Sequence, residues 1–279
     1  MADRTYITFV VAVNNREVLE NNFLASPCLQ APHEHQILVQ ENFPAAAKAY
    51  NDAIGKSVND LIVFCHQDIL LPSSWMGQLE QALLCLEKKD PLWGVLGCYG
   101  RTADGRGRKG WGHVYSPGRG IVGEPLEHPV PVQTLDELAL ILRKSSGLRF
   151  DENLPHFHFY GTDICLTAAT RGMKCYSIPA WCIHNTQLYL TYPREFYECY
   201  RHIRRKWRKH LPIQTSCVRI TRLGLPVHKL RLREIYLRCS GRQVPVTRVR
   251  DGRRVLLEVE AGNPGTGNGA IQVIDSCPP

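Results

Sequence analysis

The sequence predicts an α/β fold in which helices flank a mostly parallel sheet. Short apolar runs alternate with helical segments along most of the chain, which is typical of βαβ units. The run LIVFC at residues 61–65 is apolar throughout, as expected of a strand buried on both faces. It ends abruptly in His66, Gln67 and Asp68. Ligands of such sheets gather beyond the carboxyl ends of the strands, so Asp68 is either a site residue or an N-cap of the following turn.

The first hundred residues follow this alternation closely. Apolar runs with β-branched and aromatic residues predict strands at 7–13, 36–40, 61–65 and 93–99. Helical spacing of apolar residues predicts helices at 17–24, 44–54 and 75–88. Pro44 fits the first position of the second of these helices, because it has no amide hydrogen to satisfy there.

The middle of the chain is less regular. The glycine-dense stretch 100–123 exceeds the length of about 12–15 residues beyond which a plain loop is uncommon. It carries Trp111 and His113, so we expect a mobile flap that contacts substrate. Residues 129–134 predict an edge strand, where proline is tolerated. Asp136 and Glu137, followed by late bases, predict a helix through residue 146.

The remaining elements complete the predicted α/β core and lead into a basic region. A helix is expected at 164–171, a strand pair or one bent strand at 174–183, and a basic helix at 193–209. The basic helix is expected to dock on the core, with a lid over the site as a second interpretation and a contact with a membrane surface as a third. Residues 212–260 suggest short strands and turns, and 261–279 a disordered tail. We therefore expect three regions: an α/β domain at 1–192, a basic extension at 193–260 and the tail at 261–279.

The charge of the chain is concentrated in the predicted extension. The formal net charge of the 279 residues is +8. Residues 1–200 have a net charge of −4, whereas residues 201–254 have 17 bases and 2 acids, a net charge of +15. Such asymmetry indicates an anionic partner for this segment, and a membrane surface is one candidate. The segment contains no nucleic-acid-binding motif, so we expect no nucleic acid.

The cysteines and the hydropathy indicate the compartment. The 11 cysteines are an odd number, contain no CxxC pair and lie partly within apolar runs. No apolar run approaches the roughly 18 residues that span a bilayer. The apolar run after the N-terminus reads as a first strand rather than as a signal peptide. Together these features predict a cytoplasmic protein with reduced thiols.

Polar clusters follow several of the predicted elements. Besides His66-Gln67-Asp68, the chain has Gly161-Thr162-Asp163 and His184-Asn185, while Asn14-Asn15 and Glu41 end the first two strands. Because parallel strands end at one edge of a sheet, these groups are expected to converge. A carboxylate and an imidazole can jointly hold a divalent cation such as Mn²⁺ or Mg²⁺.

The order of these pieces resembles the inverting glycosyltransferases of family two, which have a GT-A (Rossmann-like) fold. It is closest to a branch with HQD in place of the usual DxD motif. The resemblance covers roughly residues 6–187 and is carried by FVVAVNNREVLENNFLASP, AAKAYND, LIVFCHQDILLPSSW, WGVLGCYG, VQTLDEL and FDENLPHFHFYGTDICLTAATRGMKCYSIPAWCIHN.

The resemblance implies a role for each matching residue. Asp68 would bind the metal that bridges the nucleotide diphosphate, and His184 would complete that site. His66 stands where the family has the first Asp of its motif, and a neutral imidazole does not supply the negative charge of that carboxylate. Asp163 would be the general base that deprotonates the acceptor hydroxyl. The residues matching donor-binding positions are Asn14, Glu17, Glu41, Lys48, Asn51 and Gln67.

Two functions remain open at this point. The resemblance implies metal-assisted transfer of a hexose, with inversion, from a nucleotide-sugar donor, expected to be UDP-linked. The alternative is a non-catalytic protein of the same fold that binds a nucleotide sugar or a glycan. Without the resemblance, Asp163 is more readily an N-cap and His184 an ordinary hydrogen-bonded histidine. The acceptor could touch Trp111, His113 or Asp136, but Asp136 serves equally well as a charge at a helix start.

Overall fold

A seven-stranded sheet forms the centre of the molecule. The computed structural model describes residues 6–30, 35–104, 110–188, 191–241 and 245–262. Along the sheet the strands follow the order β10-β13-β5-β12-β3-β1-β2. Their bounds, in the same order, are Val130–Val132, Cys175–Ser177, Leu96–Gly97, Ala139–Arg143, Leu61–His66, Ile7–Val13 and Gln36–Glu41.

The sheet is mixed but mostly parallel in strand direction. β1 pairs in parallel with both β2 and β3, and β5 pairs in parallel with β13. β12 is antiparallel to both of its neighbours, β3 and β5, and the edge strand β10 is antiparallel to β13. Five strands therefore run in one direction and two in the other. The edge position predicted for residues 129–134 is confirmed.

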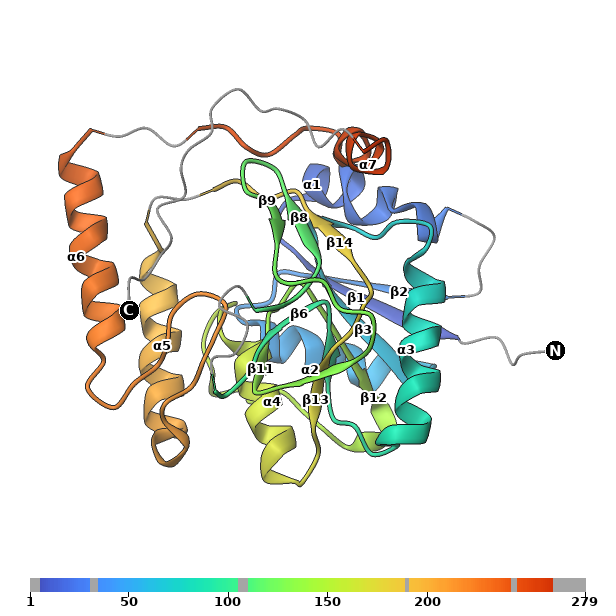
Figure 1. Ribbon diagram of the computed structural model, residues 1–279, viewed down its shortest axis with the longest axis horizontal. Helices are drawn as coiled ribbons and strands as arrows, with labels where there is room; N and C mark the ends of the chain where they lie inside the picture. The colour runs from blue at the N-terminus through green and yellow to red at the C-terminus, as the bar shows by residue number, and fades with distance from the viewer. Residues whose placement is uncertain (1–5, 31–34, 105–109, 189–190, 242–244, 263–279) are drawn as a thin grey trace.

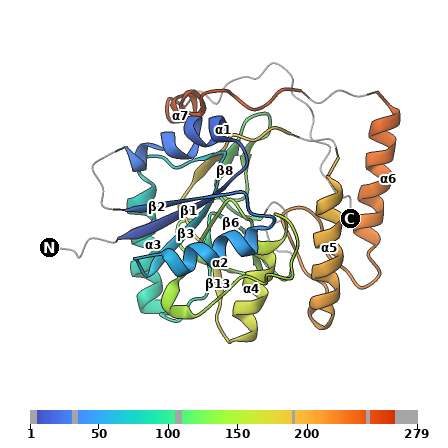
Figure 2. The same cartoon turned by 180° about the vertical axis from the view of Figure 1, so that it is seen from behind.

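Helices cover both faces of this sheet (Figure 1; Figure 2). Alternate residues of a strand point to opposite faces, so Phe9 and Val63 pack on one side, and Val10 and Phe64 on the other. The first side packs against α1 (Arg16–Asn21) and α3 (Trp75–Lys89). The second side packs against α2 (Ala46–Lys56), α4 (Tyr160–Thr170) and α5 (Arg194–Lys206). The predicted fold class, α/β with a mostly parallel sheet flanked by helices, is confirmed.

Two small sheets replace the expected flap. One has the order β4-β14-β8-β9 and the other β11-β6-β7. Their bounds are Ile69–Leu70, Cys182–His184, Val114–Ser116 and Gly120–Val122 for the first, and Thr134–Leu135, Tyr99–Arg101 and Trp111–Gly112 for the second. Much of the stretch predicted as a mobile loop is therefore paired strand, and residues 105–109 lie outside the described part. The strand predicted at 93–99 is divided between two sheets, and so is the pair at 174–183.

The prediction of a helix at 136–146 is wrong. Ala139–Arg143 forms β12, and Lys144–Ser146 forms a 3₁₀ turn. Residues 139–142 are all buried, because β12 lies inside the sheet between β3 and β5. A continuous apolar run buried on both faces has no period that separates strand from helix. The acids before it and the bases after it look like helix ends but lie in the turns.

The C-terminal region is also more helical than the sequence suggests. Instead of short strands and turns, residues 212–260 contain α6 (Leu225–Cys239) and α7 (Gly252–Glu260). Further 3₁₀ turns lie at Phe23–Ala25, Pro27–Leu29 and Arg208–His210. The basic extension is thus made of helices and irregular segments. The division at residue 192 stays a prediction, and most of the tail at 261–279 lies outside the described residues.

The extension crosses the molecule and returns to the N-terminal part. α6 lies beside α5, and α7 lies beside α1, in both views (Figure 1; Figure 2). Val255 and Leu256 of α7 pack with Leu70 and Ile183 in a small apolar cluster. Among the described residues, no helix is long and apolar enough to cross a membrane. The cysteines of the described chain are free.

Candidate metal and donor site

The three predicted metal ligands are brought together by neighbouring strand ends. His66 is the last residue of β3, and Asp68 lies in the turn between β3 and β4. β14 ends at His184, which pairs with Ile69 of β4 in an antiparallel register. The backbone amide of Asn185 also donates to the carbonyl of Asp68, at 2.9 Å. Pairing of β4 with β14 therefore fixes His184 beside Asp68, although they lie far apart in the sequence.

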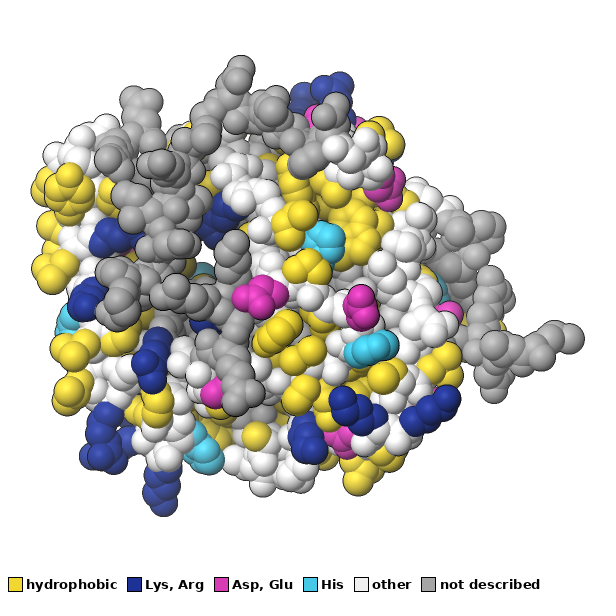
Figure 3. All heavy atoms as spheres, in the orientation of Figure 1, with side chains coloured by type: hydrophobic (Ala, Val, Ile, Leu, Met, Phe, Trp, Pro, Cys, Tyr) yellow, Lys and Arg dark blue, Asp and Glu magenta, His cyan; other side chains and the backbone are white. Residues whose placement is uncertain are grey.

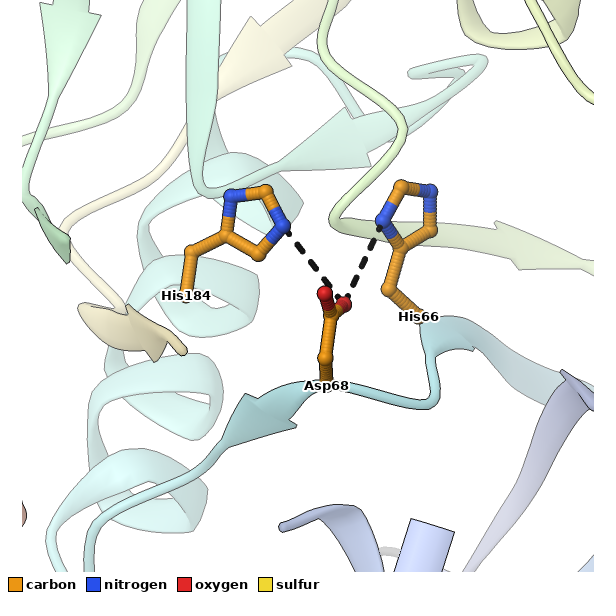
Figure 4. A group of neighbouring side chains, drawn as sticks. All are labelled: His66, Asp68 and His184. Carbon is orange, nitrogen blue, oxygen red and sulfur yellow. Dashed lines mark ion pairs between the residues drawn. The ribbon is translucent and has the colours of Figure 1, made fainter. Parts of the chain in front are cut away.

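The two imidazoles face one carboxylate oxygen from opposite sides (Figure 4). His184 Nε2 lies 3.5 Å from Asp68 Oδ1, and His66 Nδ1 lies 3.9 Å from the same oxygen. One ligand atom from each residue lies within 4.8 Å of the other two. Two atoms that bind a common ion at about 2.1 Å are about 3–3.5 Å apart, so a small inward shift of His66 would complete such a set. The cluster fits a divalent cation.

Hydrogen bonds prepare His66 as a metal ligand. The hydroxyl of Tyr160 donates to the Glu137 carbonyl at 3.2 Å, and it lies 3.0 Å from His66 Nε2. Since the single hydroxyl hydrogen is used, His66 Nε2–H must be the donor in the second bond, and the tautomer is assigned from this network. Nδ1 then presents a lone pair toward Asp68. Burial lowers the pKa of His66, which favours this neutral form despite the nearby Asp68.

A fourth charged group, Arg248, reaches the cluster from the C-terminal extension. Its Nη2 lies 3.0 Å from Asp68 Oδ2, and its Nε donates to the Asn185 carbonyl at 3.2 Å. Asp68 therefore has one oxygen toward Arg248 and the other toward the histidines. Burial opposes ionisation of Asp68, but its contact with His184, the nearby His66 and the guanidinium of Arg248 outweigh burial and lower the pKa of Asp68. Asp68 is ionised at neutral pH.

The segment that carries Arg248 is held in place by its own contacts. Asn185 Nδ2 donates to the Val249 carbonyl and to Asn22 Oδ1, both at 2.7 Å, and Asn185 Oδ1 accepts from the Val249 amide at 2.9 Å. Asn185 is fully buried. Gly252 packs so closely that a Cβ there would overlap Leu70 and Asn22. These contacts fix the position of Arg248.

Asp163 lies on the same helix as Tyr160 but makes different contacts. Its carboxylate accepts hydrogen bonds from Trp207 Nε1 at 2.6 Å and from Lys206 Nζ at 2.8 Å. The residue is 2% exposed, and it lies in the first turn of α4 rather than at the N-cap, which is Phe159. Burial raises the pKa of Asp163, against the opposing effects of Lys206 and Trp207. The structure thus places Asp163 against the end of α5, and its role as a base stays a prediction.

Two of the predicted donor-binding residues contact each other at the end of β1. Gln67 Oε1 accepts from the amides of Asn14 and Asn15, at 3.2 and 3.1 Å, and Gln67 Nε2 donates to Asn14 Oδ1. Asn15 in turn caps α1 by accepting from the Val18 amide at 3.1 Å. These bonds tie the turn after β3 to the turn after β1, so Asn14 is held against Gln67, which lies between His66 and Asp68 in the chain.

The other predicted donor contacts lie more widely apart. Glu17 is exposed and pairs with Arg250 Nε at 3.1 Å, close in sequence to Arg248. Glu41 is exposed at the end of β2 and pairs with Arg16 at 3.1 Å. Lys48 lies on the exposed side of α2. Asn51 is used structurally, because its amide donates to the Phe150 carbonyl and its oxygen accepts from the Phe150 amide, at 2.9 and 3.0 Å.

The structure also shows the contacts of the residues that were expected to touch an acceptor. His113 stacks on Trp181, with ring centroids 5.7 Å apart. The carbonyl of Trp111 accepts from the Ser177 hydroxyl at 2.8 Å. Asp136 caps the amide of Leu138 at 3.3 Å in the turn before β12, so it does not begin a helix. The charge of Asp136 opposes the lowering of the His66 pKa by burial.

A family comparison decides what kind of protein carries this site. The profile of a glycosyltransferase-like family matches residues 8–206, which include every residue of the metal cluster. The chain belongs to this glycosyltransferase-like family. Its α/β architecture is the one that the resemblance to GT-A glycosyltransferases led us to expect. Arg248 lies beyond the matched region.

More distant similarities accompany the family match. "ATP synthase subunits region ORF 6" of Fuscovulum blasticum is 29% identical over 123 residues, which are 42% of this chain and 48% of that protein. TarS of S. aureus is 14% identical with a TM-score of 0.46, over 72% of this chain and 39% of TarS. The mannosyltransferase PcManGT of Pyrobaculum calidifontis, in complex with GDP-Man and Mn²⁺, is 12% identical with a TM-score of 0.45, over 94% and 81%. Both structural likenesses are too loose to carry a functional argument. This chain spans about half the length of the Fuscovulum blasticum protein and 39% of TarS.

Two residues of this site were not anticipated from the sequence. Tyr160 immediately precedes the Gly161-Thr162-Asp163 cluster, and its proximity to that motif was the available signal. Arg248 is one of 17 bases between residues 201 and 254, and nothing in its local sequence distinguishes it from the others. Only the folded path of the extension identifies it.

Proposed function

We propose that this chain transfers a hexose from a nucleotide diphosphate donor to an acceptor hydroxyl, with inversion at the anomeric carbon. The observation that supports this most strongly is the His66–Asp68–His184 cluster with Arg248 at the carboxyl end of β3. A site beyond the strand ends of such a sheet is where a nucleotide ligand is expected. UDP is the nucleotide that we expect from the resemblance to family two.

The proposed chemistry assigns one task to each group. The acceptor oxygen forms a bond to the anomeric carbon while the bond from that carbon to the diphosphate breaks. Asp163 takes the acceptor proton, for which it must exchange its contacts with Lys206 and Trp207. His66, Asp68 and His184 would hold a divalent cation, which would stabilise the negative charge on the leaving diphosphate. Arg248, beside Asp68, adds a second positive charge at that place.

The ligand set favours Mn²⁺ over Mg²⁺ as the cation. Mg²⁺ prefers oxygen ligands in an octahedral arrangement, whereas imidazole nitrogen suits transition metals. Two of the three protein ligands here are imidazoles. We therefore infer Mn²⁺ of the two ions expected. A cytoplasmic location remains our prediction.

Calorimetry tests the donor and metal assignments together. UDP binding is measured with and without Mn²⁺, on the unaltered chain and on Asp68→Ala. We expect Mn²⁺ to strengthen UDP binding only in the unaltered chain. Equal UDP affinity in all four conditions would contradict the metal site.

One observation favours the alternative of a non-catalytic binding protein. The carboxylate of Asp163 is buried and already receives two short hydrogen bonds, so it is not free to act as a base in this conformation. Turnover of nucleotide sugars distinguishes the two functions. We expect transfer or donor hydrolysis by the unaltered chain and neither by Asp163→Asn, with UDP affinity retained in both. Unchanged turnover in Asp163→Asn would remove the base assignment, and donor binding without any turnover would favour the binding protein.

A further inference from the structure

Helix α6 has an apolar stripe on its solvent-facing side as well as on its core-facing side. Val227 and Leu237 are buried, and Leu230 packs against the core. Four large apolar side chains lie on the other side and are 58–67% exposed: Leu225, Leu232, Ile235 and Tyr236. At about 100° per residue these four fall within an arc of about 100°, which is the width of an apolar face that normally packs against something. This solvent-facing stripe has no covering element among the described residues.

Basic side chains border the stripe on both sides. By helical spacing, Arg231 and Arg238 lie along one border, and Lys229 and Arg233 along the other. All four are exposed. Figure 3 shows hydrophobic and basic side chains side by side along the left edge of the molecule, where α6 lies in Figure 1. The exposed His228 lies within the stripe, between Ile235 and Leu232. A face that is mainly apolar in the middle and basic at both edges is typical of a helix that lies in a membrane interface.

The acid of α6 does not offset these bases at the surface. Glu234 is 6% exposed, and it accepts hydrogen bonds from the Tyr192 amide and the Tyr197 hydroxyl, both at 2.6 Å. Its carboxylate is therefore used in attaching α6 to α5. Within Leu225–Cys239 the outward charge is entirely positive.

A pocket at the border of the stripe adds a place for an anionic group. It has a volume of about 350 Å³ between α5 and α6. Three bases, Arg194, Arg231 and Arg238, line it together with Glu234, whose carboxylate is already engaged by Tyr192 and Tyr197. The guanidinium of Arg231 lies over the ring of Tyr197, 4.4 Å from its centroid, which holds it at the pocket. Guanidinium groups suit phosphate, because their planar donors can bind two of its oxygens at once.

We propose that α6 docks this protein on the surface of an anionic phospholipid bilayer. Leu232, Ile235 and Tyr236 enter the boundary between headgroups and acyl chains, while the flanking bases and the pocket bind lipid phosphates. A second copy of the chain fits this surface less well, because a two-fold contact through the stripe would place its bases against themselves. Nucleic acid would leave the apolar side chains unused. The proposal is independent of the sugar-transfer reaction and needs no donor.

Vesicle flotation of the full chain tests this proposal. Binding is measured to phosphatidylcholine vesicles with and without phosphatidylglycerol, at rising salt. We expect binding only to the vesicles that contain phosphatidylglycerol, weakening as salt rises. The triple variant Leu232→Gln, Ile235→Gln, Tyr236→Gln should lose more than about tenfold in partition coefficient, because three apolar side chains no longer enter the interface. Arg233→Gln with Arg238→Gln should lose about fivefold for each base removed.

Matched controls lie on the opposite side of the molecule, on and after α3 (Figure 1). Leu84→Gln with Leu92→Gln removes two other exposed leucines, and Lys88→Gln with Lys89→Gln removes two other bases. Both controls should bind vesicles as the unaltered chain does, and circular dichroism with thermal melts should show every variant folded. The proposal is overturned if the unaltered chain ignores anionic vesicles, or if the α6 variants bind them as well as the controls do. A concentration-dependent dimer that the triple variant abolishes, without vesicle binding, would overturn it in favour of self-association.

Discussion

Arg248 Nη2 lies 3.0 Å from Asp68 Oδ2, which joins the C-terminal extension to the turn after β3 across 180 residues of sequence. The contact leaves Asp68 Oδ1 directed at His66 and His184. Asp68 is thereby shared between a fixed positive charge and the position of a cation. Asn185, which is buried and follows His184 in the chain, accepts hydrogen bonds from Arg248 Nε and from the Val249 amide. The metal cluster and the extension are therefore joined through Asn185.

Arg248→Gln should change cation and donor binding in opposite directions. Removing a positive charge beside Asp68 reduces repulsion of a bound cation, so Mn²⁺ alone should bind at least as tightly as before. UDP should bind about tenfold or more weakly, because a charge-assisted contact to diphosphate contributes roughly 1.5–3 kcal/mol. Calorimetry with Mn²⁺ alone and then with UDP measures both. Arg253→Gln is the control, since Arg253 is exposed and pairs with Asp251 in its own turn. Loss of Mn²⁺ affinity together with UDP affinity would instead assign Arg248 to positioning of Asp68.

Tyr160→Phe should weaken Mn²⁺ binding while the protein stays folded. The substitution removes the hydroxyl that accepts from His66 Nε2–H and so fixes Nδ1 as the unprotonated nitrogen. Loss of a group that orients a metal ligand typically costs about 10–100-fold in metal affinity. Tyr176→Phe is the matched control, because the hydroxyl of Tyr176 contacts Asp90, away from the cluster. Equal Mn²⁺ affinity in the two variants would show that the tautomer of His66 does not depend on Tyr160.

Gly252→Ala should destabilise the protein and loosen the segment that carries Arg248. A Cβ at this position overlaps Leu70 Cδ1 and Asn22 Oδ1, both of which lie in packed surroundings. Such overpacking typically costs about 1–3 kcal/mol of unfolding free energy. Gly55→Ala has open space around its Cβ within α2 and should be neutral or stabilise by up to about 1 kcal/mol. Urea unfolding of the two variants measures the contrast, and equal midpoints would contradict close packing at Gly252.

Acid should destabilise the protein partly through His158. Burial, with help from His66 and His156, lowers the pKa of His158 to about 4, whereas an unfolded histidine titrates near 6.5. Between these values the unfolded chain binds more protons at this residue than the folded chain does. The unfolding free energy should therefore fall as the pH falls from about 6.5 to about 4. His158→Gln should flatten this dependence in urea unfolding, whereas replacement of the exposed His228 by Gln should not. Parallel pH profiles for the unaltered chain and His158→Gln would exclude His158 as the source.

Strong local patterns in the sequence were sufficient for the first half of the fold. Ile7–Val13 and Leu61–His66 combine a strand-length apolar run with a polar stop, and α3 combines helical spacing with a basic last turn. The pattern failed at Ala139–Arg143, where burial on both faces removes the period that distinguishes a strand from a helix. It failed again at α6, because a helix that is apolar on two opposite sides has no clear amphipathic signal.

The sequence by itself determined the α/β class, since apolar runs and helical spacing are local patterns, whereas the choice of His66, Asp68 and His184 among the polar clusters came from the resemblance to family two. The tertiary structure decided which partners those residues have. Pairing of β4 with β14 placed His184 beside Asp68, and the packing of Gly252 brought Arg248 to the same carboxylate. Lys206 and Trp207, at the end of α5, donate hydrogen bonds to Asp163. Contacts between residues 43 to 180 positions apart depend on the path of the whole chain, which local spacing does not specify.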